Sequence, residues 1–231
     1  MQLNNSYPLT FDSWDISELN AIKRVIKSNQ FTYSQNVYSF EKMLAKFHKL
    51  KYCVLTNSGS SANLIAISSL FYKKSNPLKI NDEVIVPGVS WSTTYSPLQQ
   101  LGLKLKLVDI DINTLNIDFS LVEESISKNT KLIIPVNILG NPSELPKLKK
   151  LCDRKNIYLM EDNCESFGAE IENKKSGTFG LVNTLSFYYS HHISTIEGGA
   201  VLTNDTEIYE ILLSLRSHGW ARDSKKNKKQ K

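Results

Sequence analysis

The stretch IYLMEDNCESFGA, residues 157–169, decides the fold class, because a short apolar run passes directly into a polar cluster. The run at 157–161 lacks the polar alternation of a half-exposed strand. It is typical of a strand that is buried on both faces of a parallel sheet. Asp162 follows at the carboxyl end of this predicted strand. Ligands of open parallel sheets bind beyond that end, so Asp162 is a candidate functional residue.

Similar runs occur along the rest of the chain. Strands are predicted at 52–56 (YCVLT), 83–87 (EVIVP), 105–109 (LKLVD) and 132–136 (LIIPV), with helices at 61–72, 93–101, 118–127 and 143–155 between them. Two further strands, LSFYYS (185–190) and AVLTN (200–204), precede a helix at 205–216. Apolar residues at helical spacing predict two N-terminal helices, at 15–28 and 36–49. The alternation predicts an α/β fold whose mostly parallel sheet is flanked by helices.

The composition indicates an ordinary globular protein. The 231 residues are 41% hydrophobic, which is enough for one large domain. The N-terminus lacks a secretory pattern, and no run approaches the roughly 18 apolar residues of a membrane span, so a cytoplasmic location is expected. Cys53, Cys152 and Cys164 are scattered without CxxC spacing. They indicate reduced, mostly buried thiols, and no metal site is predicted.

The net charge of +5 comes from the C-terminus. The last seven residues, KKNKKQK, contain five lysines, and removing them leaves 5 − 5 = 0. The remaining chain is therefore balanced and gives no indication of nucleic-acid or membrane binding. A disordered tail is expected at 223–231. A basic contact tail and an abnormal stop of the chain are its two explanations.

Polar segments follow several of the predicted strands. Ser58, Gly59, Ser60 and Ser61 lie in a turn that opens a helix, where free backbone N–H groups favour a phosphate, although a plain helix cap has the same pattern. Asp162 suits a cationic partner such as a pyridinium nitrogen, or simply caps a turn.

Two more candidate segments have equally ordinary alternatives. Trp91 is either a core residue or a platform for a flat ring. His191 and His192 lie in a Ser/Thr-rich turn that is either functional or merely a surface turn.

Taken together, these segments resemble the DegT/DnrJ/EryC1/StrS family of sugar aminotransferases, over residues 7–222. The resemblance implies the large domain of a pyridoxal-phosphate (PLP)-dependent transferase of fold type I, similar to aspartate aminotransferase. It implies an N-terminal helical segment at 1–34 and a PLP-binding domain at 35–222. Family members continue into a smaller C-terminal domain, which helps to close the site. A truncated or split form is therefore expected.

The resemblance also implies the cofactor-binding residues. The family's phosphate ligands correspond to Ser58, Gly59, Ser60, Ser61 and Ser186. Trp91 corresponds to the aromatic residue that stacks on the cofactor ring, and Asp162 corresponds to the carboxylate that pairs with the pyridine nitrogen. Glu165 corresponds to a position near the ring hydroxyl where most members have glutamine.

His191 departs from the family pattern. The family's Schiff-base lysine lies six residues before the Glu-Gly-Gly turn, and counting back from Glu197 gives His191. A histidine there resembles the keto-deoxysugar 3-dehydratases, above all the GDP-4-keto-6-deoxymannose type. Histidine does not hold a stable imine with the cofactor, but it moves protons near neutral pH. The cofactor would then be held without a covalent bond, with pyridoxamine phosphate as the working form.

The resemblance predicts the reaction and its participants. His191 would remove a proton from the cofactor, Asp162 would keep the ring nitrogen protonated, and the C3 hydroxyl of a nucleotide-linked 4-keto-6-deoxy sugar would leave. L-glutamate would restore the amino group, and the protein would be a homodimer, because family sites are built at a subunit interface. The expected role is dideoxysugar and O-antigen biosynthesis. A 4-aminotransferase and a non-catalytic relative are the alternatives, and GDP is favoured over CDP.

Overall fold

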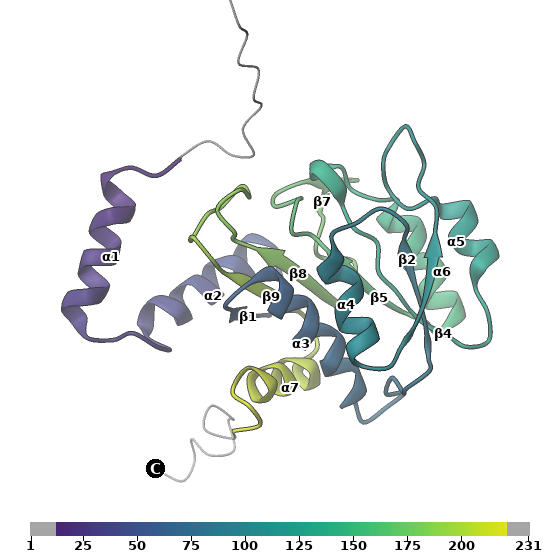
Figure 1. The fold of residues 1–231 in the computed structure, drawn as a ribbon, viewed down its shortest axis with the longest axis horizontal. Coiled ribbons are helices and arrows are strands. Elements are labelled where there is room, and N and C mark those ends of the chain that lie inside the picture. The colour runs from purple at the N-terminus through teal and green to yellow at the C-terminus, as the bar shows by residue number, and fades with distance from the viewer. Residues whose placement is uncertain (1–12, 221–231) are drawn as a thin grey trace, which may run out of the picture.

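The computed structural model describes residues 13–220 and has a seven-stranded sheet at its centre (Figure 1). The strands are β1 (Tyr52–Thr56), β2 (Glu83–Pro87), β3 (Lys104–Val108), β4 (Thr130–Ile133), β5 (Tyr158–Asp162), β8 (Val182–Ser186) and β9 (Gly199–Thr203). Their order in the sheet is β1-β9-β8-β5-β4-β2-β3. Only β9 runs antiparallel to its neighbours, while the four other adjacent pairs are parallel. The predicted mostly parallel sheet is confirmed.

Helices cover both faces of this sheet. The helices are α1 (Ile16–Ser28), α2 (Gln35–Phe47), α3 (Gly59–Phe71), α4 (Ser92–Gln100), α5 (Phe119–Ser125), α6 (Leu145–Lys155) and α7 (Thr206–Arg216), with a 3-10 turn η1 at Ile138–Gly140. Helices α3, α4 and α7 share one core with the sheet. On the other face α5 and α6 pack against β2 to β5, and α2 packs against β1, β8 and β9. The result is three layers with a core on each side of the sheet.

Two predicted strands differ from those observed. The segment LSFYYS was expected to form a strand, but β8 starts earlier, at Val182, and ends at Ser186. Tyr188 and Tyr189 lie in the following turn, where each residue is about two-fifths exposed. Strand β4 ends at Ile133, shortly before Pro135, which has no N–H to donate to a ladder.

A small hairpin was not predicted at all. Strands β6 (Glu170–Ile171) and β7 (Lys174–Lys175) pair antiparallel between β5 and β8. Both are only two residues long and contain a single apolar residue, Ile171, so they carry no apolar periodicity.

Helix α1 stands apart from the layered body (Figure 1). Asp15 caps it and forms a capping box with Glu18, and none of its residues is buried. It falls within the predicted segment 1–34. Within residues 13–220 no helix is both long and apolar enough to cross a bilayer. The predicted tail at 223–231 lies outside the described residues.

Candidate functional site

The carboxyl ends of β1, β5 and β8 lie on the same edge of the sheet, because these three strands run in one direction. Strand β9 runs the opposite way and begins at that edge. The residues that follow these strands are therefore brought together from four separate parts of the sequence. All the predicted site residues lie in these segments, at the start of α4, or in the turn between β8 and β9.

The N-terminus of α3 and the end of β8 meet closely. Ser58 caps α3, and its Oγ accepts a hydrogen bond from the Ser61 backbone N–H at 3.1 Å. A Cβ added at Gly59 would lie 2.6 Å from the Cβ of Ser186. The first helical residue therefore has to be glycine for Ser186 to reach the helix N-terminus. This arrangement collects backbone N–H groups, hydroxyls and the positive end of a helix dipole, which together suit an anion.

The first residue of β9 closes the same corner. A Cβ at Gly199 would lie 2.2 Å from the carbonyl oxygen of Ser58 and 2.6 Å from the backbone nitrogen of Gly59. No side chain fits between these backbones. Gly199, the second glycine of the Glu-Gly-Gly turn, is therefore required because β9 approaches the start of α3 too closely for any side chain.

Asp162 ends β5 and is only 4% exposed. Its Oδ2 accepts hydrogen bonds from Asn63 Nδ2 at 2.9 Å and Thr94 Oγ1 at 3.0 Å. Its Oδ1 accepts from the backbone N–H of Cys164 at 3.2 Å. None of the ion pairs between described residues includes Asp162. A buried carboxylate with only neutral donors is suited to receive a cation.

Three polar residues around Asp162 were missed by sequence reasoning. Asn63 and Thr94 orient the carboxylate directly, and Thr184 donates to Asn63 Oδ1 at 2.7 Å. All three are buried. Asn63 offered a signal, because it is a polar residue on the face of α3 that otherwise buries Ala62, Ala66 and Ile67.

Trp91 lies directly before α4 and is 73% exposed, so the core alternative for this residue is wrong. Its carbonyl oxygen accepts from the Thr94 N–H at 3.0 Å, which places it one turn from the Asp162 network. Glu165 lies in the segment after β5, where its Oε2 accepts from the backbone N–H of Leu139 at 2.9 Å.

His191 lies in the turn between β8 and β9 and is partly buried, whereas the adjacent His192 is exposed. Burial lowers the pKa of His191, the nearby carboxylates of Glu165 and Asp162 raise it, and His192 lowers it further. The net shift is downward, which favours the neutral ring, the form that can act as a base. Its backbone N–H bonds the Tyr188 carbonyl at 2.9 Å.

The cysteines and possible metal ligands add no second centre in the described part of the chain. Cys53 and Cys152 are buried free thiols and Cys164 is partly buried. Burial raises the pKa of Cys152 to about 12. Across residues 13–220, no three His, Cys, Asp or Glu side chains gather as ligands for a metal.

Comparison with known proteins gives one family and close relatives. Residues 13–231 match the family model described as the DegT/DnrJ/EryC1/StrS aminotransferase family. The sequence is 50% identical over 218 residues to a GDP-4-keto-6-deoxy-D-mannose 3-dehydratase of Yersinia pseudotuberculosis, covering 94% of this chain and 56% of the relative. It is 52% identical over 224 residues to the enzyme of the same name from Escherichia coli O55:H7, covering 96% and 58%. The chain thus spans just over half the length of these relatives.

Solved structures of enzymes with this name are similar to the structure of this chain. The E. coli GDP-4-keto-6-deoxy-D-mannose 3-dehydratase with bound hydrated PLP has a TM-score of 0.92 and 52% identity, with 95% of this chain and 56% of that chain covered. Two more share the TM-score of 0.92 at 51% identity, covering 95% of this chain and 57% of theirs. One is a variant with bound GDP-perosamine, and the other holds a trapped PLP-glutamate geminal diamine.

Proposed function

The chain belongs to the DegT/DnrJ/EryC1/StrS aminotransferase family, and on that premise we propose that it acts in the C3 deoxygenation of a nucleotide-linked 4-keto-6-deoxy sugar. The observation that carries this proposal is the partly buried His191, whose pKa is lowered by burial, where the sequence pattern places the family's lysine. The names of its relatives support a GDP-linked mannose derivative as substrate. The role in dideoxysugar and O-antigen polysaccharide synthesis is part of the same proposal.

The fold is that of the PLP-dependent transferases of fold type I, as expected from the resemblance. This agreement makes pyridoxal or pyridoxamine 5'-phosphate the cofactor to propose. The described residues fit it in two respects: Asp162 is a buried carboxylate without a cationic partner among them, and the capped start of α3 suits an anion.

We assign the phosphate of the cofactor to the corner between α3, β8 and β9. Ser58, Gly59, Ser60 and Ser61 would surround it with backbone N–H groups and hydroxyls, and Ser186 would add a hydroxyl from β8. Trp91, exposed beside this edge, would stack on the ring, and Glu165 would lie near the ring hydroxyl.

Asp162 would pair with the pyridine nitrogen of the ring. Its carboxylate is already oriented by Asn63 and Thr94, so it would hold a proton on that nitrogen without rearranging. When bound, the aminated cofactor supplies an amine that condenses with the 4-keto group and a ring that accepts electrons.

His191 would act as the base and then as the acid. Its lowered pKa favours the neutral ring, which can take a proton from the carbon next to the cofactor ring. Once protonated, the same ring can donate that proton to the departing C3 hydroxyl. Histidine forms no stable imine with the cofactor, which would therefore be held by contacts with phosphate and ring alone.

The partners follow from the same proposal. A GDP-linked 4-keto-6-deoxy sugar is the proposed substrate and L-glutamate the donor that restores the amine. The relatives that hold GDP-perosamine and a PLP-glutamate adduct support both. A homodimer and a cytoplasmic location are part of the proposal, as is the division into an N-terminal segment at 1–34 and a PLP-binding domain at 35–222.

The test is incubation of the protein with pyridoxamine phosphate and GDP-4-keto-6-deoxymannose, followed by assays for ammonia and the 3-deoxy sugar. Both products are expected in equal amounts. A glutamate-dependent amino sugar in place of the deoxy sugar would identify a 4-aminotransferase. Cofactor binding without any product would identify a non-catalytic relative.

Borohydride distinguishes the cofactor linkage without needing turnover. We expect that the protein loaded with PLP and treated with borohydride releases its cofactor on dialysis under denaturing conditions, because His191 holds no reducible imine. Mass spectrometry of the treated chain is the readout. A reduced cofactor attached to any lysine contradicts the assignment of His191.

A further inference from the structure

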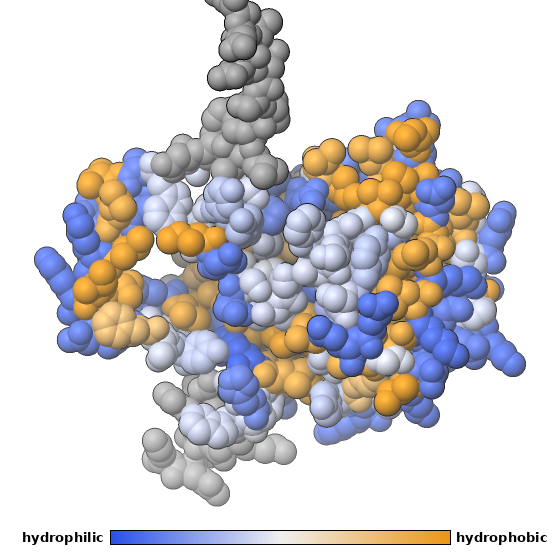
Figure 2. Space-filling model, viewed as in Figure 1, coloured by the Kyte–Doolittle hydropathy of each residue, from blue (hydrophilic) through white to orange (hydrophobic). Residues whose placement is uncertain are grey.

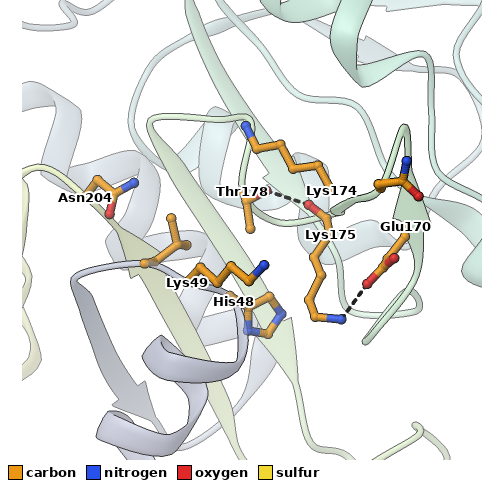
Figure 3. A pocket seen from close by; sticks show the side chains of 9 residues that line it. His48, Lys49, Glu170, Lys174, Lys175, Thr178 and Asn204 are labelled. Carbon is orange, nitrogen blue, oxygen red and sulfur yellow. Dashed lines mark hydrogen bonds and ion pairs between the residues drawn. The ribbon is translucent and has the colours of Figure 1, made fainter.

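A pocket lies between the end of α2 and the β6–β7 hairpin (Figure 3). It is found where β1 begins and β9 ends, whereas the candidate site is found where β1 ends and β9 begins. Its volume is about 200 Å³. The lining residues come from the end of α2, the β6–β7 hairpin and the segments beside β1 and β9, and they include His48, Lys49, Glu170, Lys174 and Lys175.

The lining is positively charged. It contains Lys49, Lys174 and Lys175 against the single acid Glu170, which gives 3 − 1 = +2. The Lys175 ammonium group is held in place, because it bonds Glu170 Oε1 at 2.8 Å and lies 4.4 Å above the ring centre of Phe47. Lys49 lies on the other side of the pocket in the close view, above His48 (Figure 3). The positive charges thus surround the space from two separate segments of the chain.

His48 contributes an unpartnered polar atom beneath this charge. The residue is 3% exposed, and its Nδ1 bonds the carbonyl oxygen of Leu44 at 3.0 Å, so Nδ1 carries the proton. Its Nε2 is buried without a hydrogen-bond partner. Phe47 and Phe167 contact the ring edge-on, which fixes its orientation. Burial and the nearby Lys175 charge lower the pKa of His48.

We propose that this pocket binds a phosphate group, with Lys49 and Lys175 as its charge partners and His48 Nε2 as a donor from below. A bound dianion would favour the imidazolium form, in which Nε2–H donates to a phosphate oxygen, the partner that this buried atom lacks. Phosphate suits the lining better than carboxylate. Separate lysine ammonium groups act as point charges around a tetrahedral anion, whereas flat carboxylates are held bidentately by arginine, which this lining lacks.

The first test is the titration of His48 by NMR in the protein saturated with PLP, so that the candidate site is already filled. Inorganic phosphate is added at constant ionic strength, with chloride as the comparison. Phosphate is expected to raise the pKa of His48 saturably and to leave the NMR signals of the exposed His192 unchanged. A His48 signal that responds equally to both salts would overturn the proposal. Guanosine monophosphate, titrated in parallel, shows whether the natural source is a free or an organic phosphate.

Matched charge variants provide the second test. Lys49→Gln should weaken phosphate binding about tenfold, the usual effect of losing one charge-assisted contact. Glu170→Gln should strengthen binding, because it removes the only acid of the lining. Damage to the fold cannot produce that opposite effect. Lys104→Gln removes an equal charge from β3, at the far edge of the sheet, and should change nothing. Equal affinities of the Lys49, Glu170 and Lys104 variants would mean that the lysines are merely solvated.

Discussion

At the scale of single residues, His191 and Asp162 divide the proposed chemistry between them. His191 is partly buried with a lowered pKa, as a base at neutral pH requires. Asp162 is buried, hydrogen-bonded by neutral groups and free of any ion pair with a described residue. One side chain is arranged to exchange a proton and the other to keep its charge.

Replacing His191 by Asn should abolish dehydration, because an amide cannot accept and return a proton. Loss of a general base typically lowers the rate ~10²–10⁴-fold. Cofactor binding should persist, since phosphate and ring contacts come from other residues. Product formation and cofactor affinity, measured side by side, check this.

The neighbouring histidine and the restored lysine serve as controls for that experiment. His192→Asn should be milder, because His192 is exposed. His191→Lys should form an imine, visible as a shift in the cofactor's absorption. An inactive His192→Asn beside an active His191→Asn would show that the base is assigned one position off.

Asp162→Asn should weaken cofactor binding about 10- to 100-fold, because a neutral amide cannot hold the ring nitrogen protonated. The loss corresponds to one buried charge-assisted hydrogen bond, roughly 1.5–3 kcal/mol. Fluorescence titration with PLP measures it. Asp109→Asn, an exposed acid at the end of β3, is the matched control. Unchanged affinity of Asp162→Asn would place the ring elsewhere.

The sequence pointed to the residues that follow strands but missed those that orient them. Asp162 was found because it ends an apolar run. Asn63 and Thr94 were missed because their contacts with Asp162 span 99 and 68 residues, and Thr184 was missed because its bond to Asn63 spans 121 residues. No local pattern encodes such distances. The two glycines at 59 and 199 likewise owe their importance to a close approach of distant backbones.

At the scale of elements, buried strands were the easiest to predict. Strands β1, β2, β3 and β5 match the predicted ranges to within one residue at each end, because strands covered on both faces appear as continuous apolar runs. Tyr188 and Tyr189, which follow β8, led to a predicted strand that extends beyond the observed end at Ser186. Aromatic residues favour strands, but here they line a turn beside the candidate site.

Glu161, one residue before Asp162, binds the backbone of residues 177–180, which lead into β8. It is fully buried and accepts hydrogen bonds from the backbone N–H groups of Gly177, Phe179 and Gly180 at 2.6–2.8 Å. Burial raises the pKa of Glu161, and these three donors oppose the rise. No short-range pattern predicted this role, because its partners lie 16 to 19 residues away.

Glu161→Gln should lower the free energy of unfolding by roughly 1–3 kcal/mol, because the amide nitrogen would face an N–H donor instead of accepting from it. Urea unfolding measures the change. Glu123→Gln, which removes an exposed acid from α5, should have little effect. If both variants unfolded at the same urea concentration, the Glu161 contacts would contribute nothing to stability.

At the scale of the whole molecule, the layered body and α1 differ in how they are stabilised. The body buries apolar residues on both faces of its sheet. Helix α1 buries none, and Ile16, Leu19, Ile22 and Ile26 are between 39% and 61% exposed. Figure 2 shows hydrophobic surface along this helix. Its apolar spacing was plain in the sequence, but a pattern of that kind does not say what the helix packs against.

This exposed face leads to the last prediction, that the chain forms a homodimer through α1. Isolated helices shorter than about 12–15 residues are marginally stable in water, so this 13-residue helix needs a partner surface. Light scattering should give 2 × 26.2 = 52.4 kDa. Ile22→Lys/Ile26→Lys should give monomers that keep the fold of the body, because neither side chain is buried in one copy. Lys23→Ala, on the same helix, should leave the dimer intact. A monomeric parent chain that still binds PLP tightly would contradict the prediction.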